Sequence, residues 1–164
     1  MPIQVVISHA HDDEALATRF VGLLRCALPA LAGAIRCTSV DGHGLEAGAH
    51  TSTELRAELR AARVVVGLLT PHAAQRGWVL FELGAAWGAG VHVIPVVAAG
   101  LQLADAPGPL KEVQAVDGAN ENAVSRMLES IATRTGVLLA GIAAYKVEFQ
   151  QFVEAASELE DDDD

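Results

Sequence analysis

The stretch Trp78-Val-Leu-Phe-Glu-Leu-Gly-Ala-Ala-Trp87 predicts a helix that packs on more than one side. Its only charged residue is Glu82, which stands among large apolar and small side chains. An ionised carboxylate that is buried without a partner costs several kcal/mol, so such a residue is usually paired, protonated or engaged with a ligand. Trp78 lies four residues before Glu82, which places the indole and the carboxylate on one helical face.

Two interpretations of Glu82 follow from this pattern. An aromatic ring beside a carboxylate suits a flat, positively charged ligand. Alternatively, the helix belongs to the core and Glu82 forms a structural ion pair with Arg63 or Arg76. The helix alone does not decide between them, and Trp78 can pack in the core and line a cleft at once.

Length and composition predict one α/β domain. A chain of 164 residues has room for one real core, and its richness in Ala, Val and Leu is typical of buried parallel strands. The balance of 21 acidic against 11 basic residues argues against a nucleic-acid groove. No apolar run is long enough to span a bilayer, so we expect a cytoplasmic protein with no membrane partner. Cys26 and Cys37 are expected to be free thiols.

Strand and helix patterns alternate along the chain. Strands are predicted at residues 3–7, 35–40, 63–69, 91–97 and 113–116. Helices are predicted at residues 13–28, 51–62 and 120–135, with a further helix beginning at Trp78. This order predicts a doubly wound parallel sheet flanked by helices.

Polar loops follow three of the predicted strands, at residues 8–11, 41–50 and 70–78. Ligands bind at the carboxyl ends of strands in such sheets, so we expect these loops to meet at one cleft. The glycine-rich loop from Asp41 to His50 is a candidate functional loop, although simple flexibility explains it as well. Its glycines do not form G-x-G-x-x-G.

The chain divides into a domain at residues 1–136, an amphipathic helix at 137–157 and an acidic tail at 158–164. The helix either packs against the domain as a further layer or provides a surface for self-association. The sequence is compatible with both.

His9-Ala-His11-Asp12-Asp13 resembles the H-x-H-x-D pattern of zinc hydrolases. The position that would supply another histidine is occupied by Asp13, and the other histidines show no organised spacing. We therefore expect no metal site, a solvated helix start for His11 and the acids, and a place in the cleft for His9, with an ordinary loop histidine as the alternative.

Four segments in series resemble the TIR (Toll/interleukin-1 receptor) domain in its bacterial form. They are Val5-Val-Ile-Ser-His-Ala-His-Asp-Asp13, Leu45-Glu-Ala-Gly48, the strand Val64–Thr70 followed by Trp78-Val-Leu-Phe-Glu82, and Val93-Ile-Pro-Val96. The likeness covers about residues 3 to 135. It departs at Arg76-Gly77, where many members have a serine, and after Gly136.

This resemblance implies a flavodoxin-like sheet of five parallel strands and, in catalytic members, cleavage of the nicotinamide–ribose bond of NAD+. The catalytic glutamate of the family falls on Glu82. Carried over in the same way, the substrate-binding residues are Ser8, His9, Asp41, Leu45, Gly48 and Trp78. NAD+ is then the substrate, no cofactor is required, and the product is ADP-ribose or a cyclic ADP-ribose-type signal in bacterial antiphage defence or signalling.

The alternative that the resemblance leaves open is a non-catalytic adaptor, because fold does not fix function. Both alternatives imply self-association through contacts between TIR domains, including filaments, and an effector or sensor protein as a further partner.

Overall fold

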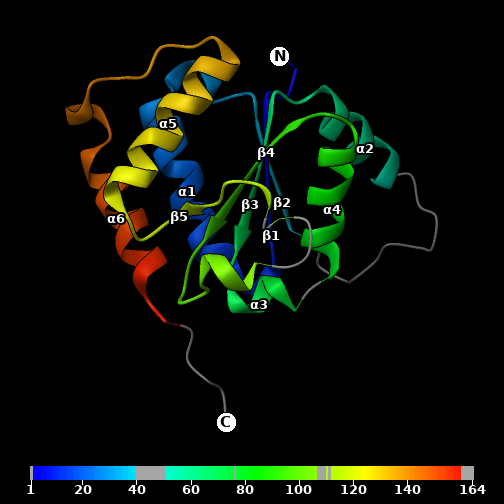
Figure 1. Cartoon of the computed structure of the whole chain (residues 1–164). Helices are drawn as coiled ribbons and strands as arrows, with labels where there is room; N and C mark the ends of the chain where they lie inside the picture. The colour runs from blue at the N-terminus through cyan, green and yellow to red at the C-terminus, as the bar shows by residue number, and fades with distance from the viewer. Residues whose placement is uncertain (1, 40–50, 76, 107–109, 111, 160–164) are drawn as a thin grey trace.

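The computed structural model describes residues 2–39, 51–75, 77–106, 110 and 112–159. Five parallel strands form one sheet in the order β2-β1-β3-β4-β5 (Figure 1). The strands are β1 (Val5–His9), β2 (Ile35–Ser39), β3 (Val64–Leu69), β4 (His92–Val97) and β5 (Val116–Asp117). This is the flavodoxin-like strand order, so the predicted fold class is confirmed.

Helices cover both faces of the sheet. On one face lie α2 (Thr51–Ala61) and α4 (Gly77–Gly88), and on the other lie α1 (Glu14–Ala27), α5 (Glu121–Thr135) and α6 (Lys146–Ser157) (Figure 1). Successive residues of each strand point to opposite faces of the sheet, so they pack into two different hydrophobic cores. Val6 and Val65 belong to the core on the α4 side, whereas Val5 and Ile7 belong to the core on the α1 side. The central strands are therefore apolar on both faces.

The fifth strand lies later in the chain than the sequence predicts. We expected it at residues 113–116, but it is confined to Val116–Asp117, which pair with the end of β4. The backbone N–H of Val113 donates to the carbonyl of Leu110, so the predicted start is part of a turn. The valine pattern alone did not distinguish that turn from a strand.

The C-terminal helix α6 begins at Lys146, later than the predicted residue 137. Gly136 ends α5 in the left-handed conformation, with φ 72°, and the chain then runs without helix before α6 starts. Phe152 of α6 is fully buried, and its ring centroid lies 5.1 Å from that of Phe20 on α1. The inner side of α6 thus forms a further layer of the domain.

No helix in the described ranges is long and apolar enough to cross a membrane. Of the predicted acidic tail, Glu158 and Leu159 are described, and residues 160–164 lie outside the described residues.

Candidate active site

Glu82 lies on the inner face of α4, against the carboxyl-terminal parts of β1 and β2, and only 1% of it is exposed. Ser8 and Thr38 face it from these two strands, where they are paired in register. Gly67 is the neighbour of Ser8 on β3, and a Cβ there would lie 2.4 Å from Cδ1 of the buried Leu83. The absence of a side chain at Gly67 lets α4 lie close to the sheet, which brings Glu82 to the level of the strand side chains.

One of the two carboxylate oxygens of Glu82 accepts a well-formed hydrogen bond within the protein. Its Oε2 accepts a hydrogen bond of 2.9 Å from Thr38 Oγ1. The other oxygen, Oε1, is buried, and so are Ser8 Oγ and Trp78 Nε1, and none of these three atoms makes a hydrogen bond of standard geometry with a described residue. The two donors nevertheless lie close enough to Glu82 to lower its pKa. Buried polar atoms normally have well-formed hydrogen bonds, so incompletely bonded groups around one carboxylate mark it as a candidate site for a ligand.

Burial raises the pKa of Glu82 from 4.5 to about 7, and interactions with Thr38, Trp78 and Ser8 partly oppose this shift. No described cation contributes to the pKa of Glu82, and Arg63 is not among its partners. Arg76, the other partner of the ion-pair interpretation, lies outside the described residues. Within the described part of the chain, Glu82 is therefore a carboxyl group held by neutral donors.

The raised pKa of Glu82 predicts that the protein loses stability as pH rises. The folded state holds this proton more tightly than the unfolded chain, so its contribution is complete below pH 4.5 and is lost as pH rises to about 7. A shift of this size corresponds to about 3 kcal/mol of the free energy of unfolding. Urea denaturation at a series of pH values should show this loss in the wild type and not in Glu82→Gln. Equal pH profiles for the two proteins would contradict it.

Thr38→Val is expected to raise the pKa of Glu82 further, because valine keeps the shape of threonine and removes the hydroxyl donor. A hydrogen bond to a charged group contributes about 1.5–3 kcal/mol, so the loss of stability should extend at least about one pH unit higher. The same denaturation series measures this shift. Thr133→Val is the matched control, since the Thr133 hydroxyl donates to the Glu129 carbonyl on α5, and it should leave the profile unchanged.

The structure brings together three of the residues predicted for the site: Glu82, Ser8 and Trp78. Trp78 is half-buried one helical turn before Glu82, and its ring centroid lies 5.8 Å from that of Phe81. Thr38 was not predicted. Its signal was the parallel register, which places it beside Ser8, and that register becomes visible only once the strands are paired.

Of the other predicted site residues, His9 is described, and it lies away from this cluster. His9 is buried, its Nδ1 lies 2.7 Å from the carbonyl oxygen of Ala10, and strand alternation places it on the side of Ile7, away from Ser8. Asp41, Leu45 and Gly48 lie outside the described residues. Among the described residues, the Glu82 cluster is therefore formed by β1, β2 and α4.

A second polar cluster fixes the segment that leads into α4. Thr70 caps the short helix α3 (Pro71–Ala74) by accepting from the N–H of Ala73, and its hydroxyl donates to the carboxylate of Asp13. His72 Nδ1 lies 3.6 Å from the same carboxylate. Asp13 is therefore buried, where the sequence predicted a solvated helix start, because it links the beginning of α1 to the end of β3.

The described residues include no group of three or more His, Cys, Asp or Glu side chains arranged to hold a metal ion. The H-x-H-x-D pattern does not form such a group among them: His9 is buried in β1, His11 is exposed, and Asp13 is bonded to Thr70.

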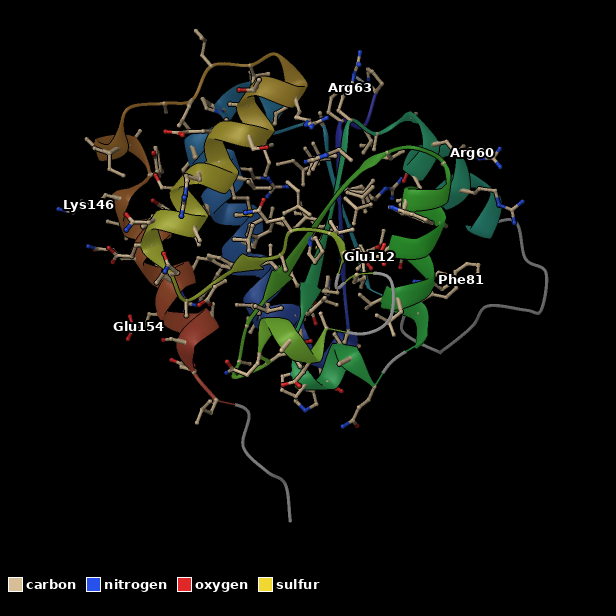
Figure 2. All side chains as sticks on the ribbon, viewed as in Figure 1. Arg60, Arg63, Phe81, Glu112, Lys146 and Glu154 are labelled. Carbon is tan, nitrogen blue, oxygen red and sulfur yellow. The ribbon has the colours of Figure 1, made fainter. Side chains whose placement is uncertain are left out.

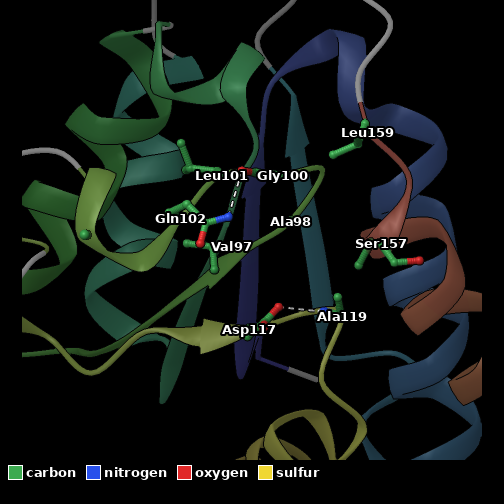
Figure 3. A pocket seen from close by; sticks show the side chains of 11 residues that line it. Val97, Ala98, Gly100, Leu101, Gln102, Asp117, Ala119, Ser157 and Leu159 are labelled. Carbon is green, nitrogen blue, oxygen red and sulfur yellow. Dashed lines mark hydrogen bonds between the residues drawn. The ribbon is translucent and has the colours of Figure 1, made fainter.

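A separate pocket of about 370 Å³ lies beyond the carboxyl ends of β4 and β5, next to the end of α6 (Figure 3). Asp117 is its only charged lining residue among those described, and Asp117 Oδ1 accepts a hydrogen bond of 2.9 Å from the N–H of Ala119. It shares no lining residue with the Glu82 cluster. The carboxylate at this pocket is thus partly used to hold a turn.

Residues 5–129 match a protein family described as TIR domain. No curated protein matches the sequence at the level required for significance. Among solved structures, a metazoan TIR-STING receptor from C. gigas is similar, with a TM-score of 0.50 and 19% identity. That likeness covers 85% of this chain and 42% of the receptor, so the chain spans less than half of the receptor's length.

Two further solved structures are more distant. The 2-desoxiribosyltransferase from Leishmania mexicana has a TM-score of 0.48 and 15% identity over 77% of this chain and 97% of its own. The TIR domains of the activated Roq1 resistosome, which recognises the pathogen effector XopQ, have a TM-score of 0.38 and 19% identity over 94% of this chain and 81% of theirs. With TM-scores below 0.5, these two likenesses carry no weight.

Proposed function

The chain belongs to the TIR domain family, and on this premise we propose that it is an NAD+ nucleosidase or cyclase that cleaves the bond between nicotinamide and ribose. The observation that supports the proposal best is the cluster around Glu82. A buried carboxyl oxygen, a serine hydroxyl and an indole N–H lie near one another, and none of them makes a hydrogen bond of standard geometry with a described residue. Together they offer charge and hydrogen bonds to a cationic, hydroxyl-rich ligand.

The chemistry of NAD+ requires little more than such a carboxylate. Nicotinamide is a cationic group in NAD+ and leaves as a neutral molecule, so neither a strong acid nor a metal is needed to expel it. As the bond breaks, positive charge develops on the ribose, and the Glu82 carboxylate stabilises that charge as carboxylates do in glycoside hydrolysis. Water then adds to the sugar, giving ADP-ribose and one proton, or a nucleophile of the same molecule closes a cyclic product.

The raised pKa of Glu82 fits this role. At about 7 it leaves both forms of the carboxyl group populated near neutral pH, and a positive nicotinamide ring beside it favours the ionised form. Because 1% of Glu82 is exposed, a ligand must displace groups that now cover the carboxylate. The same burial excludes water from the carboxylate, which strengthens its interaction with the developing charge.

The remaining roles rest on the resemblance to the family. We assign Ser8 and Trp78 to the wall of the site, and the loop residues Asp41, Leu45 and Gly48 to further contacts with NAD+. His9 follows Ser8 at the end of β1 but faces the opposite side of the strand, so we assign it no contact. A cytoplasmic location and a part in bacterial defence or signalling belong to the same proposal.

The adaptor alternative is favoured by two observations. Glu82 is almost completely covered, and the outward side of α4 is apolar and exposed, as an interaction surface would be. In this alternative the domain acts by self-association and by contacts with other TIR domains.

The two functions are separated by incubating the chain at high concentration with NAD+, with and without a crowding agent, and resolving the products by chromatography and mass. The enzyme releases nicotinamide together with linear or cyclic ADP-ribose. NADH is the matched control, because its dihydronicotinamide is neutral and a poor leaving group, so it should remain intact. No release from NAD+ in any assembled state would support the adaptor.

A further inference from the structure

The outward face of α4 carries no charged side chain. The exposed positions of the helix are Gly77, Phe81, Gly84, Ala85, Trp87 and Gly88. Phe81 is 65% exposed, whereas the exposed faces of α5 and α6 carry charged residues such as Glu129 and Glu154. A surface helix normally presents polar residues to water, so this face is suited to contact another molecule.

A groove of about 550 Å³ runs between this face and α2. It is lined by Arg56, Leu59, Arg60, Ala85, Gly88 and Ala89. Arg56 and Arg60 are exposed and form no ion pair with a described residue. On a chain of net charge −10, this groove combines an apolar floor with positive charge. It fits an acidic segment that also carries an apolar side chain.

The segment from Glu154 to Leu159, which covers the end of α6 and the two residues after it, has this composition. Leu159 is 75% exposed, and Glu154 and Glu158 are exposed beside it in the sequence. The sequence continues with five more acidic residues, at positions 160–164. Glu154 lies on the opposite side of the molecule from Arg60 and Phe81 (Figure 2). One copy therefore cannot fill its own groove with this segment, but a second copy can.

We propose that the groove between α2 and α4 receives the Leu159 end of α6 from a second copy of this chain, with Glu154 and Glu158 facing Arg56 and Arg60. Because the two surfaces lie on opposite sides of the molecule, the contact joins the copies head to tail. Each pair of copies then keeps one free groove and one free α6 end, to which further copies can bind. The result is a linear assembly. This contact names the surfaces for the proposed self-association and does not depend on NAD+ cleavage.

Charge favours this arrangement over a symmetric one. A two-fold contact through α4 would bring Arg56 and Arg60 of both copies to the same interface, where like charges repel. The head-to-tail contact places them opposite carboxylates. Leu159 covers the apolar floor in the same step.

The test reverses the charge on each side in turn. At physiological salt, the weight-average mass of the wild type from sedimentation equilibrium should rise with concentration beyond twice the monomer mass of 17.1 kDa. Arg56→Glu/Arg60→Glu and Glu154→Arg/Glu158→Arg should each remain at the monomer mass. An equimolar mixture of the two double variants should assemble again, because the reversed groove matches the reversed α6 end.

Arg19→Glu/Arg126→Glu is the control for the groove variant, since it makes the same change in net charge at exposed positions outside the groove and should assemble like the wild type. Circular dichroism confirms that each variant is folded. A wild type that stays monomeric at every concentration, a groove variant that assembles normally, or a mixture that stays monomeric would each overturn the proposal. Assembly that survives both charge reversals but is lost in Phe81→Asp would instead establish the symmetric contact.

Discussion

Glu82→Gln is expected to lower the rate of nicotinamide release from NAD+ by about 10²–10³-fold, the usual effect of removing one preorganised stabilising group. The substitution keeps the size of the side chain and an oxygen that can accept from Thr38 Oγ1. It removes the negative charge that faces the developing charge on the ribose. The loss should therefore appear in kcat, measured by chromatography of nicotinamide under saturating NAD+.

Two controls separate this prediction from a general loss of structure. Glu129→Gln makes the same chemical change at an exposed position on α5 and should keep the wild-type rate. Glu82→Gln should be folded, and above pH 7 more stable than the wild type, since it no longer buries an ionisable carboxyl group. An unfolded Glu82→Gln would instead support the interpretation of Glu82 as part of a structural ion pair.

Phe152→Ala is expected to lower the free energy of unfolding by about 3–5 kcal/mol, the usual cost of removing a buried aromatic ring. Phe152 is 0% exposed and packs against Phe20, so the substitution leaves a cavity between α6 and α1. The position lies beyond residue 129, where the match to the TIR family ends. A loss of this size would show that α6 is part of the folding unit.

Urea denaturation at one pH measures the effect of Phe152→Ala. Phe81→Ala is the matched control, because it removes the same atoms from an exposed ring and should cost much less. A change in Phe152→Ala no larger than in Phe81→Ala would mean that α6 is only loosely attached to α1.

The sheet was predictable because its strands leave a strong pattern. Buried parallel strands are near-continuous apolar runs, and β3 and β4 are such runs separated by a helix. The fifth strand is harder to locate, because a strand of two residues is too short to show alternating polarity and the apolar Val113 in the preceding turn resembles a strand residue. The position of a strand as short as β5 is determined by its pairing with β4, which is a tertiary contact.

The site was predictable where one element determines it. Helical spacing places Trp78 beside Glu82, and both contribute to the observed cluster. Thr38 required the pairing of β1 with β2, which no local pattern records. The distance between His9 and the Glu82 cluster could have been anticipated, since consecutive residues on a strand face opposite sides of the sheet.

Asp13 and α6 were less predictable for a different reason. An acidic residue at a helix start is usually solvated. Asp13 is buried because β3 pairs beside β1, which brings Thr70, at the end of β3, next to Asp13. The apolar side of α6 was visible from its spacing, but its partner on α1 was not. In both cases the sequence shows which side chains are acidic or apolar, but a contact with a residue distant in the sequence decides whether they are buried.

The central claim is that the Glu82 cluster cleaves NAD+. It is tested most directly by following one sample of NAD+ by proton NMR after adding the wild-type chain, with a parallel sample that contains Glu82→Gln at the same folded concentration. We expect the resonances of free nicotinamide to grow in the first sample and NAD+ to remain unchanged in the second. Intact NAD+ in both samples, or equal release in both, would contradict it.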